Sequence, residues 1–392
     1  MTGSRARVMR AFAHQLPDRT PLFELFWPYH PIHWPICGRN VATEEELAWN
    51  ALADGISAEE LAEADARAAF AISRYFQLDM VHIPIWRPKE LARPQKAGKG
   101  RWRLDGAYYI VSERTKLVVL EEPTAQDADS LKVSEVRRRE EIANWDGTVP
   151  QPDQECPYAL RRLQEMAVAE GYDWVYMGEV GAGTGVAFYP PFQLMWFADE
   201  TELLRRWLDM MKAQAFAETQ RQMNWGCEVM VVGGDVSSDK GPFISPRNYR
   251  EFILPVMQQH VALIHQNRAL AVYTSDGNHW PIRDAFFFDT DIDGYQEVDQ
   301  AAGMTMERLI AEGVKDRVCI IGNVDARHTL CLGTPEQVKA EVHRCLALGS
   351  LMPGGHILHT SHSVHEDVKP QNYHAMVAAY REHYGLPPLP SL

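Results

Sequence analysis

The sequence predicts an α/β barrel of eight parallel strands, each followed by a helix. Two observations favour this fold. Short apolar runs rich in β-branched and aromatic residues alternate with longer amphipathic segments, and nearly every suggestive polar residue follows one of the short runs. Such a barrel keeps its chemistry at the carboxyl ends of its strands. An open, doubly wound sheet is the alternative that the same alternation allows.

Eight apolar runs are expected to form the strands of this barrel. They are residues 21–27, 79–85, 173–179, 227–233, 269–274, 292–297, 317–323 and 355–361. The strongest helix candidates between them are residues 157–169, 200–223, 246–267, 304–312 and 335–348. Two of these helices have a hydroxyl cap followed by a first-turn proline, at Ser245 with Pro246 and at Thr334 with Pro335.

Residues 86–150 interrupt the alternation. A basic stretch (87–103) is followed by a hairpin-like pair (108–111 and 116–120) and then by a charged helix near residues 133–142. We predict an insertion after the second strand, within a single domain of residues 1–392. The sequence does not choose between a lid and a dimer surface for this insertion, so a homodimer remains possible.

Composition restricts the function. The 392 residues are 46% hydrophobic, as in a globular protein, and the net charge of −14 argues against binding nucleic acid through its backbone. No apolar run is long enough to span a membrane, and the N-terminus lacks the apolar core of a signal peptide. The six cysteines are far apart, with no C-x-x-C pair, which favours reduced thiols and a cytoplasmic location.

Polar and aromatic residues follow the expected strands and should meet at one mouth of the barrel. The candidates are Tyr29, Trp34, Glu179, Asp235, Asp276, Glu297, Asn323 and His362, with Tyr189 in the segment after the third strand. For His362 a solvated loop position is an equal alternative, and Tyr29 and Trp34 either plug the barrel or pack on a ligand. The glycines of residues 181–185 lack G-x-G-x-x-G spacing, which favours an active-site loop over a dinucleotide site.

The second half of the chain resembles the uroporphyrinogen decarboxylase superfamily, which includes cobamide-dependent methyltransferases. Several ordered blocks carry this resemblance: Gly234 with Asp235, Ser245 and Pro246 with Tyr249, Ser275 to Asn278, Gly322 to Asp325, Gly333 to Pro335, and Gly354 to Val364. The resemblance implies an α/β barrel with its site at the carboxyl ends of the strands, in agreement with the pattern above.

The chain departs from both known branches. The decarboxylase branch holds substrate carboxylates with an arginine-rich motif, whereas here the first arginine in the equivalent region is Arg39. The methyltransferase branch binds zinc through a His-x-Cys motif and a later cysteine, and the corresponding positions here are near Asp276 and His362. No thiolate remains at those positions, but Asp276 and His362 still suggest a divalent metal site, with zinc as the metal.

We therefore expect a methyltransferase that moves a methyl group from a small methylated donor to a corrinoid carried by a partner protein. Asp276, Glu297 and His362 are the expected catalytic residues, because a leaving oxygen or nitrogen needs an acid or a metal. Tyr29, Trp34, Glu179, Tyr189, Asp235 and Asn323 are the expected substrate contacts. The alternatives are a decarboxylase of a cyclic or aromatic acid, which a cationic pocket would favour, and a binding barrel without catalysis.

Overall fold

A parallel sheet of seven strands forms the centre of the molecule. The computed structural model describes residues 3–26, 29–82, 91–121, 128–149, 155–180, 192–351 and 354–391. The strands, in spatial order, are β1 (Met80–His82), β6 (Val175–Glu179), β7 (Val229–Gly233), β10 (Leu270–Thr274), β11 (Gly294–Gln296), β12 (Cys319–Ile321) and β13 (His356–Ile357). Every neighbouring pair is parallel, which confirms the predicted α/β barrel class.

The first expected strand occupies the eighth position of the barrel. The Phe23 amide donates to the Leu358 carbonyl at 3.1 Å, beside β13, while the Leu22 carbonyl accepts from the Asp79 amide at 2.8 Å, beside β1. Only isolated bridges form here, at Leu22 and Phe26. The segment nevertheless links the two edge strands, so it closes the ring of the barrel.

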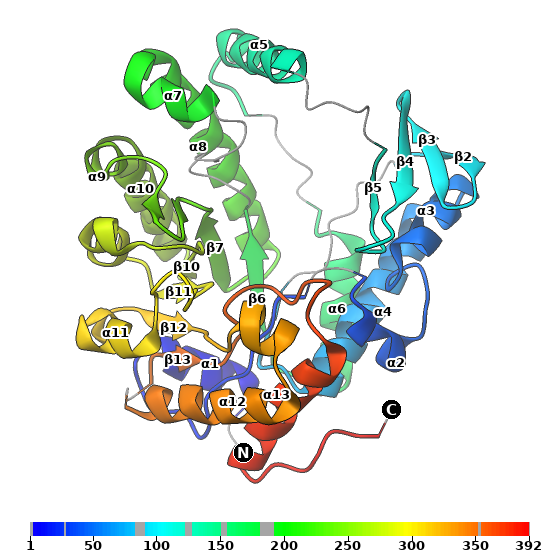
Figure 1. The fold of residues 1–392 in the computed structure, drawn as a ribbon, viewed down its shortest axis with the longest axis vertical. Helices are drawn as coiled ribbons and strands as arrows, with labels where there is room; N and C mark the ends of the chain where they lie inside the picture. The colour runs from blue at the N-terminus through cyan, green and yellow to red at the C-terminus, as the bar shows by residue number, and fades with distance from the viewer. Residues whose placement is uncertain are drawn as a thin grey trace.

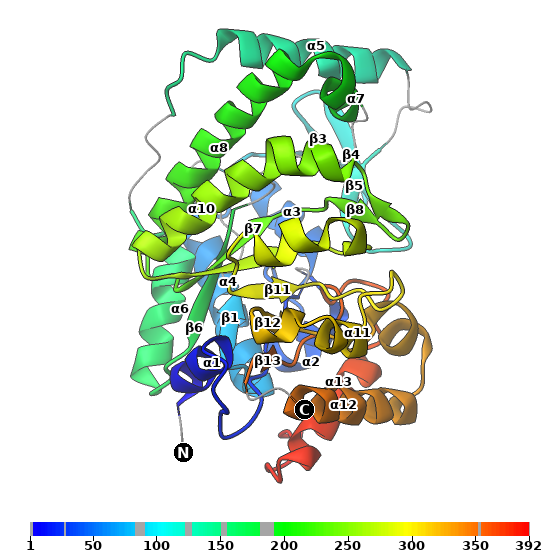
Figure 2. The same ribbon diagram turned by 90° about the vertical axis from the view of Figure 1, so that its left-hand side faces the viewer.

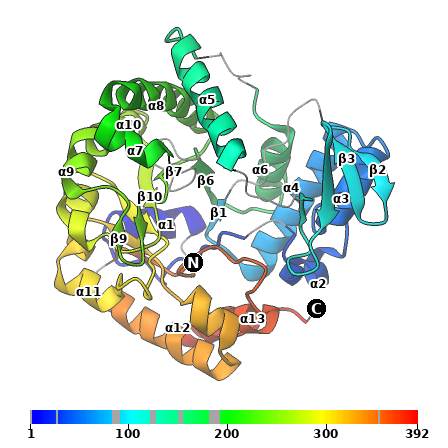
Figure 3. The same cartoon turned by 45° about the horizontal axis from the view of Figure 1, so that its top comes forward.

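Helices surround the strands on the outside (Figures 2 and 3). They are α4 (Ala58–Phe76), α6 (Tyr158–Ala169), α8 (Thr201–Asn224), α10 (Leu254–Gln266), α11 (Met306–Ala311), α12 (Pro335–Ser350) and α13 (Pro370–His383). The helices expected at 157–169, 200–223 and 335–348 are confirmed. The helix expected at 246–267 is divided into α9 (Pro246–Asn248), a π-helical turn η2 (Tyr249–Ile253) and α10. The prediction did not include α4 or α13.

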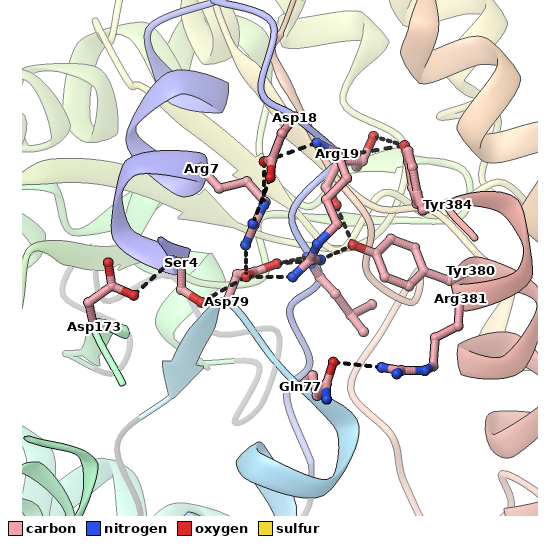
Figure 4. Close-up of polar contacts among 12 residues, drawn as sticks. Ser4, Arg7, Asp18, Arg19, Gln77, Asp79, Asp173, Tyr380, Arg381 and Tyr384 are labelled. Atoms are coloured by element: carbon pink, nitrogen blue, oxygen red, sulfur yellow. Dashed lines mark hydrogen bonds and ion pairs between the residues drawn. The ribbon is translucent and has the colours of Figure 1, made fainter. Parts of the chain in front are cut away.

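Helix α1 (Ser4–Phe12) lies below the barrel in Figure 1 and covers the amino ends of the strands. Its residues Val8, Ala11 and Phe12 are buried among side chains that point into the barrel. Figure 4 shows the ionic contact beside it: the buried carboxylate of Asp79 accepts from Arg7 at 2.5 Å and from Arg19 at 2.9 Å. This end of the barrel is therefore closed.

The insertion after β1 is a separate antiparallel sheet followed by a helix. The sheet contains β2 (Gln95–Gly98), β3 (Arg101–Leu104), β4 (Ala107–Val111) and β5 (Val118–Leu120), and the helix is α5 (Ala128–Asn144). Strands β4 and β5 pair as the predicted hairpin. The sheet lies beside α3 (Glu45–Ala53), and α5 crosses above the barrel near α7 (Phe192–Asp199) (Figures 1 and 3). The insertion thus stands on the side of the open mouth.

The remaining elements are short. They are η1 (Pro31–His33), α2 (Trp34–Cys37), β8 (Ser237–Ser238), β9 (Gly241–Pro242), η3 (Trp280–Ile282), η4 (Asp284–Phe288), η5 (Val314–Asp316) and η6 (Ala326–Leu330). Within the described ranges, no helix has the length and apolar character needed to cross a bilayer.

Candidate functional site

Three adjacent strands bring the predicted acids together at the mouth. Thr274, the last residue of β10, is in register with Gly233 of β7 and with Gln296 of β11. Asp235, Asp276 and Glu297 each follow the end of one of these strands by one or two residues. The backbone amide of Asp276 donates to the Asp235 carboxylate, and the Thr274 hydroxyl donates to Glu297. The structure thus places these three carboxyls at the ends of adjacent strands, and their role in a site stays a prediction.

The local backbone holds this cluster in an uncommon conformation. Glu297 has a φ of 64°, in the left-handed region that non-glycine residues seldom adopt, and Gly277 beside Asp276 has a φ of 87°. A Cβ at Gly277 would lie 2.8 Å from the backbone of Ser237. The Asp276 loop therefore packs tightly on the loop after β7, and its glycine is required for that approach. Strained residues of this kind cluster at functional sites.

Mutual repulsion and burial keep protons on these acids at higher pH than usual. Burial, and then the charge of Asp235, raises the pKa of Asp276 from 3.8 to about 6, while His362 opposes the change. Burial also raises the pKa of Glu297 from 4.5 to about 7, again with opposition from His362. The pKa of Asp235 rises for the same first cause, although its side chain still reaches solvent at the open mouth. Carboxyl groups whose pKa values are raised toward 7 are suited to acid–base catalysis near neutral pH.

A cavity of about 730 Å³ opens directly on Asp276 and His362. Its volume is in the range of small-molecule sites. The other lining residues are Arg114, Asp299, Ala326, Arg327, Cys331, Leu332, Ser361, His365 and Asp367. Neither Glu297 nor Asp235 is among the described lining residues, and Asp235 acts on Asp276 through its charge. The cavity thus combines two predicted catalytic residues with several residues that the prediction omitted.

The omitted residues come from two kinds of position. Asp299 and Arg327 follow β11 and β12 by a few residues, so the strand-end rule could have identified them. Arg114 lies in the turn between β4 and β5 of the insertion and pairs with Asp367 at 2.9 Å. No local pattern shows that this turn reaches a residue 253 positions away along the chain.

Three predicted substrate contacts are engaged away from this cavity. Glu179, at the end of β6, pairs with His82 of β1 at 3.0 Å, and this contact lowers the pKa of Glu179. The Trp34 indole donates to the Thr43 carbonyl at 2.9 Å, so it has a structural partner. Asn323 is completely buried, and its side-chain oxygen accepts from the thiol of Cys345 on α12 at 3.6 Å. Asn323 therefore faces the helix layer and not the mouth.

Two further candidates remain predictions. Tyr29 is partly buried with a φ of 67°, and its contact with a ligand is untested. Tyr189 and the glycine-rich residues 181–185 lie outside the described residues.

The predicted metal site does not fit the described side chains. A structural or catalytic zinc ion needs three or four protein ligands. The described ranges contain no group of three or more histidine, cysteine, aspartate or glutamate side chains placed to hold an ion. Asp276 and His362 would need a third protein ligand to hold a zinc ion.

Beneath His362 lies a buried support. The Glu24 carboxyl, fully enclosed between strand and helix layers, contacts the Thr360 hydroxyl at 2.8 Å, and Thr360 also contacts the backbone carbonyl of His362. Burial raises the pKa of Glu24 to about 8. A hydroxyl has one proton to donate, so a protonated Glu24 that donates to Thr360 satisfies both contacts. Glu24 thereby fixes the backbone that presents His362.

The fold and the site define an α/β barrel protein with an acid cluster at its open mouth. Residues 135–383 match the family model for uroporphyrinogen decarboxylase (URO-D), and the chain belongs to this family. The uroporphyrinogen decarboxylase of Aeromonas salmonicida is 27% identical over 255 residues, which cover 60% of this chain and 66% of that protein. The enzyme of Psychromonas ingrahamii is 30% identical over 192 residues, or 47% and 49% of the two chains. The chain thus spans from about half to just under two thirds of these relatives' lengths.

A solved structure supports the same fold over the whole chain. A methyltransferase from Methanosarcina mazei aligns with a TM-score of 0.66 at 17% identity, covering 98% of this chain and 100% of that one. At this level of identity the similarity establishes the α/β barrel fold and does not identify the reaction.

Proposed function

We propose that this protein is a methyltransferase that takes a methyl group from a small methylated donor and passes it to a corrinoid on a partner protein. The observation that carries the proposal is the Asp276 carboxyl, which lines the cavity and has its pKa raised to about 6. Removing a methyl group from an ether oxygen requires a proton for the leaving oxygen. Asp276 faces the space where that oxygen would lie.

The roles of the chain's own groups follow from the geometry. Asp276 donates its proton to the leaving oxygen while the carbon–oxygen bond breaks and both bonding electrons stay on oxygen. The charge of Asp235, added to burial, raises the pKa of Asp276, which favours the protonated form of Asp276 before the step. His362 stabilises the carboxylate after it. The corrinoid supplies the nucleophilic cobalt that accepts the methyl group.

Decarboxylation of a cyclic or aromatic acid is the second candidate, and one observation favours it. The cavity has two arginines on its lining, Arg114 and Arg327, and a guanidinium group can bind the carboxylate of such a substrate. Two other arginines lie away from this lining: Arg39 pairs with Glu44 at 2.6 Å, and the Arg247 side chain is 88% exposed on α9. In this reaction Asp276 would protonate the carbon from which carbon dioxide leaves.

One experiment separates the two reactions. The protein is mixed with cob(I)alamin and a panel of aromatic methyl ethers and methylamines, and methylcobalamin is followed by its absorbance. A second panel of cyclic and aromatic carboxylic acids with a labelled carboxyl group reports carbon dioxide release. Methyl transfer that is lost in Asp276→Asn and kept in the exposed control Asp284→Asn supports the proposal. Carbon dioxide release without methyl transfer would replace it with the decarboxylase.

A further inference from the structure

The arginines on the cavity lining come from two distant parts of the chain. Arg114 is in the turn after β4 of the insertion, and Arg327 is in η6, directly after β12. Their guanidinium groups contact the carboxylates of Asp367 at 2.9 Å and of Asp239 at 3.4 Å. Two cations thus stand on one cavity in a protein whose net charge is −14.

Both ion pairs are easy to open. The side chains of Arg114 and Asp367 are 75% and 50% exposed, and those of Arg327 and Asp239 are 55% and 60% exposed. Exposed ion pairs of this kind contribute little to the stability of the fold. A ligand anion that leaves water for the cavity can therefore replace either aspartate at small cost, and arginine binds carboxylates through two parallel hydrogen bonds.

The acids on the same lining determine how an anion must lie. Asp276 and Asp299 also line the cavity, so a ligand charge placed beside them would be repelled. Although burial opposes it, the charges of Asp299 and Asp239 raise the pKa of Arg327, which keeps this guanidinium protonated. Asp276 also raises the pKa of Arg327, so Arg327 stands within reach of the acids. An anionic group is therefore favoured at the arginines on the side of Arg114, and an uncharged or proton-accepting group is favoured at Asp276.

We propose that the cavity binds a small carboxylate, with its acid group on Arg114 and Arg327 and its reacting group directed at Asp276. The volume of about 730 Å³ is that of a ring-sized molecule and far exceeds a one-carbon donor. A carboxylate with one negative charge suits this site better than a phosphate with two, because Asp276 and Asp299 on the lining repel additional negative charge. The proposal deepens the proposed function, since it names the substrate class, and it places the insertion in the binding site through Arg114.

Binding is tested without turnover. The probes are 4-methoxybenzoate, its uncharged amide 4-methoxybenzamide and 4-methoxyphenyl phosphate, and titration calorimetry measures their dissociation constants. We expect the carboxylate to bind at least about tenfold more tightly than the amide, because charge-assisted hydrogen bonds are roughly twice as strong as neutral ones. The phosphate should bind more weakly than the carboxylate, and tighter phosphate binding would overturn the choice of carboxylate.

Matched variants locate the anion. Arg114→Gln and Arg327→Gln should each weaken 4-methoxybenzoate binding about tenfold without changing amide binding, whereas the control Arg247→Gln on the outer face should change neither. Thermal unfolding of all three variants should match the parent, since only exposed pairs are lost. Equal affinity for acid and amide, no saturable binding of the acid at millimolar concentration, or unchanged binding in both lining variants would overturn the inference. Arginine-dependent binding with neither methyl transfer nor carbon dioxide release would uphold it while rejecting the proposed function.

Discussion

Replacing Asp276 by asparagine should stabilise the protein at alkaline pH while it removes the acid. The folded structure takes this carboxyl partly out of water and places it beside the charge of Asp235, so its charged form is unfavourable. Asparagine has nearly the same shape and carries no charge. If Asp276 serves the reaction at a cost in stability, its replacement should raise the stability of the fold and lower the activity.

The size of the effect follows from the pKa. A carboxyl at about 6 in the folded protein and at 3.8 in the unfolded chain costs the fold about 3 kcal/mol once both states are ionised. The folded pKa is the higher one, so stability is greatest below pH 3.8 and falls as pH rises through 6. Partial solvent access to the cavity screens the charge, which reduces the expected gain at pH 8 to about 1–3 kcal/mol. About half of the gain should remain at pH 5.

Urea unfolding of the parent and of Asp276→Asn at pH 5 and pH 8 measures the gain and its pH dependence. Asp284→Asn removes an exposed carboxylate and should change stability little at either pH. The decisive quantity is the change in the stabilisation between the two pH values. A destabilised Asp276→Asn protein, or a stabilisation that is the same at both pH values, would refute the electrostatic account of this site.

Two further predictions concern other acids. Glu297→Gln should remove the inflection of the pH–rate profile near pH 7, where the parent loses the Glu297 proton, and leave the fall near pH 6 that follows Asp276; rates measured from pH 5 to 9 check this, and an unaltered profile would contradict it. Asp79→Asn should destabilise the fold by about 3–5 kcal/mol, because Arg19 then loses its carboxylate partner at this buried site and Arg7 loses one of two, keeping Asp18. Glu228→Gln, which opens an exposed pair with Arg5, should cost about 0–1 kcal/mol in the same urea titration, and equal losses would contradict the role of burial.

The strands could be predicted because burial on both faces leaves a clear mark on sequence. Each strand of a closed parallel sheet is covered inside and outside, so its residues are continuously apolar, as in β7, where every residue is buried. Residues 21–27 carried the same mark, although their hydrogen bonds form only isolated bridges. Helix α4 was not predicted, although its N-terminus has a capping box formed by Ser57 and Glu60.

The site was only half predictable for a similar reason. Residues that follow strands, such as Asp276 and Glu297, are placed by the barrel itself, so their position in sequence implies their position in space. The direction of a side chain is not implied, and Asn323 turned toward Cys345 on α12 and away from the mouth. Arg114 depended on how a whole insertion packs on the barrel, which is a tertiary property with no local signal.

The thiols of the chain also bear on how the site works. The cavity lining includes Cys331, and burial raises the pKa of its thiol to about 11. A thiol with that pKa stays protonated at neutral pH and is a poor nucleophile. Asp276 and Glu297, by contrast, change their protonation between about pH 6 and 7, and Asp276 also faces the cavity. The groups that respond near neutral pH are therefore carboxyls, so the loop after β10 favours proton transfer to a leaving group over attack by a thiolate.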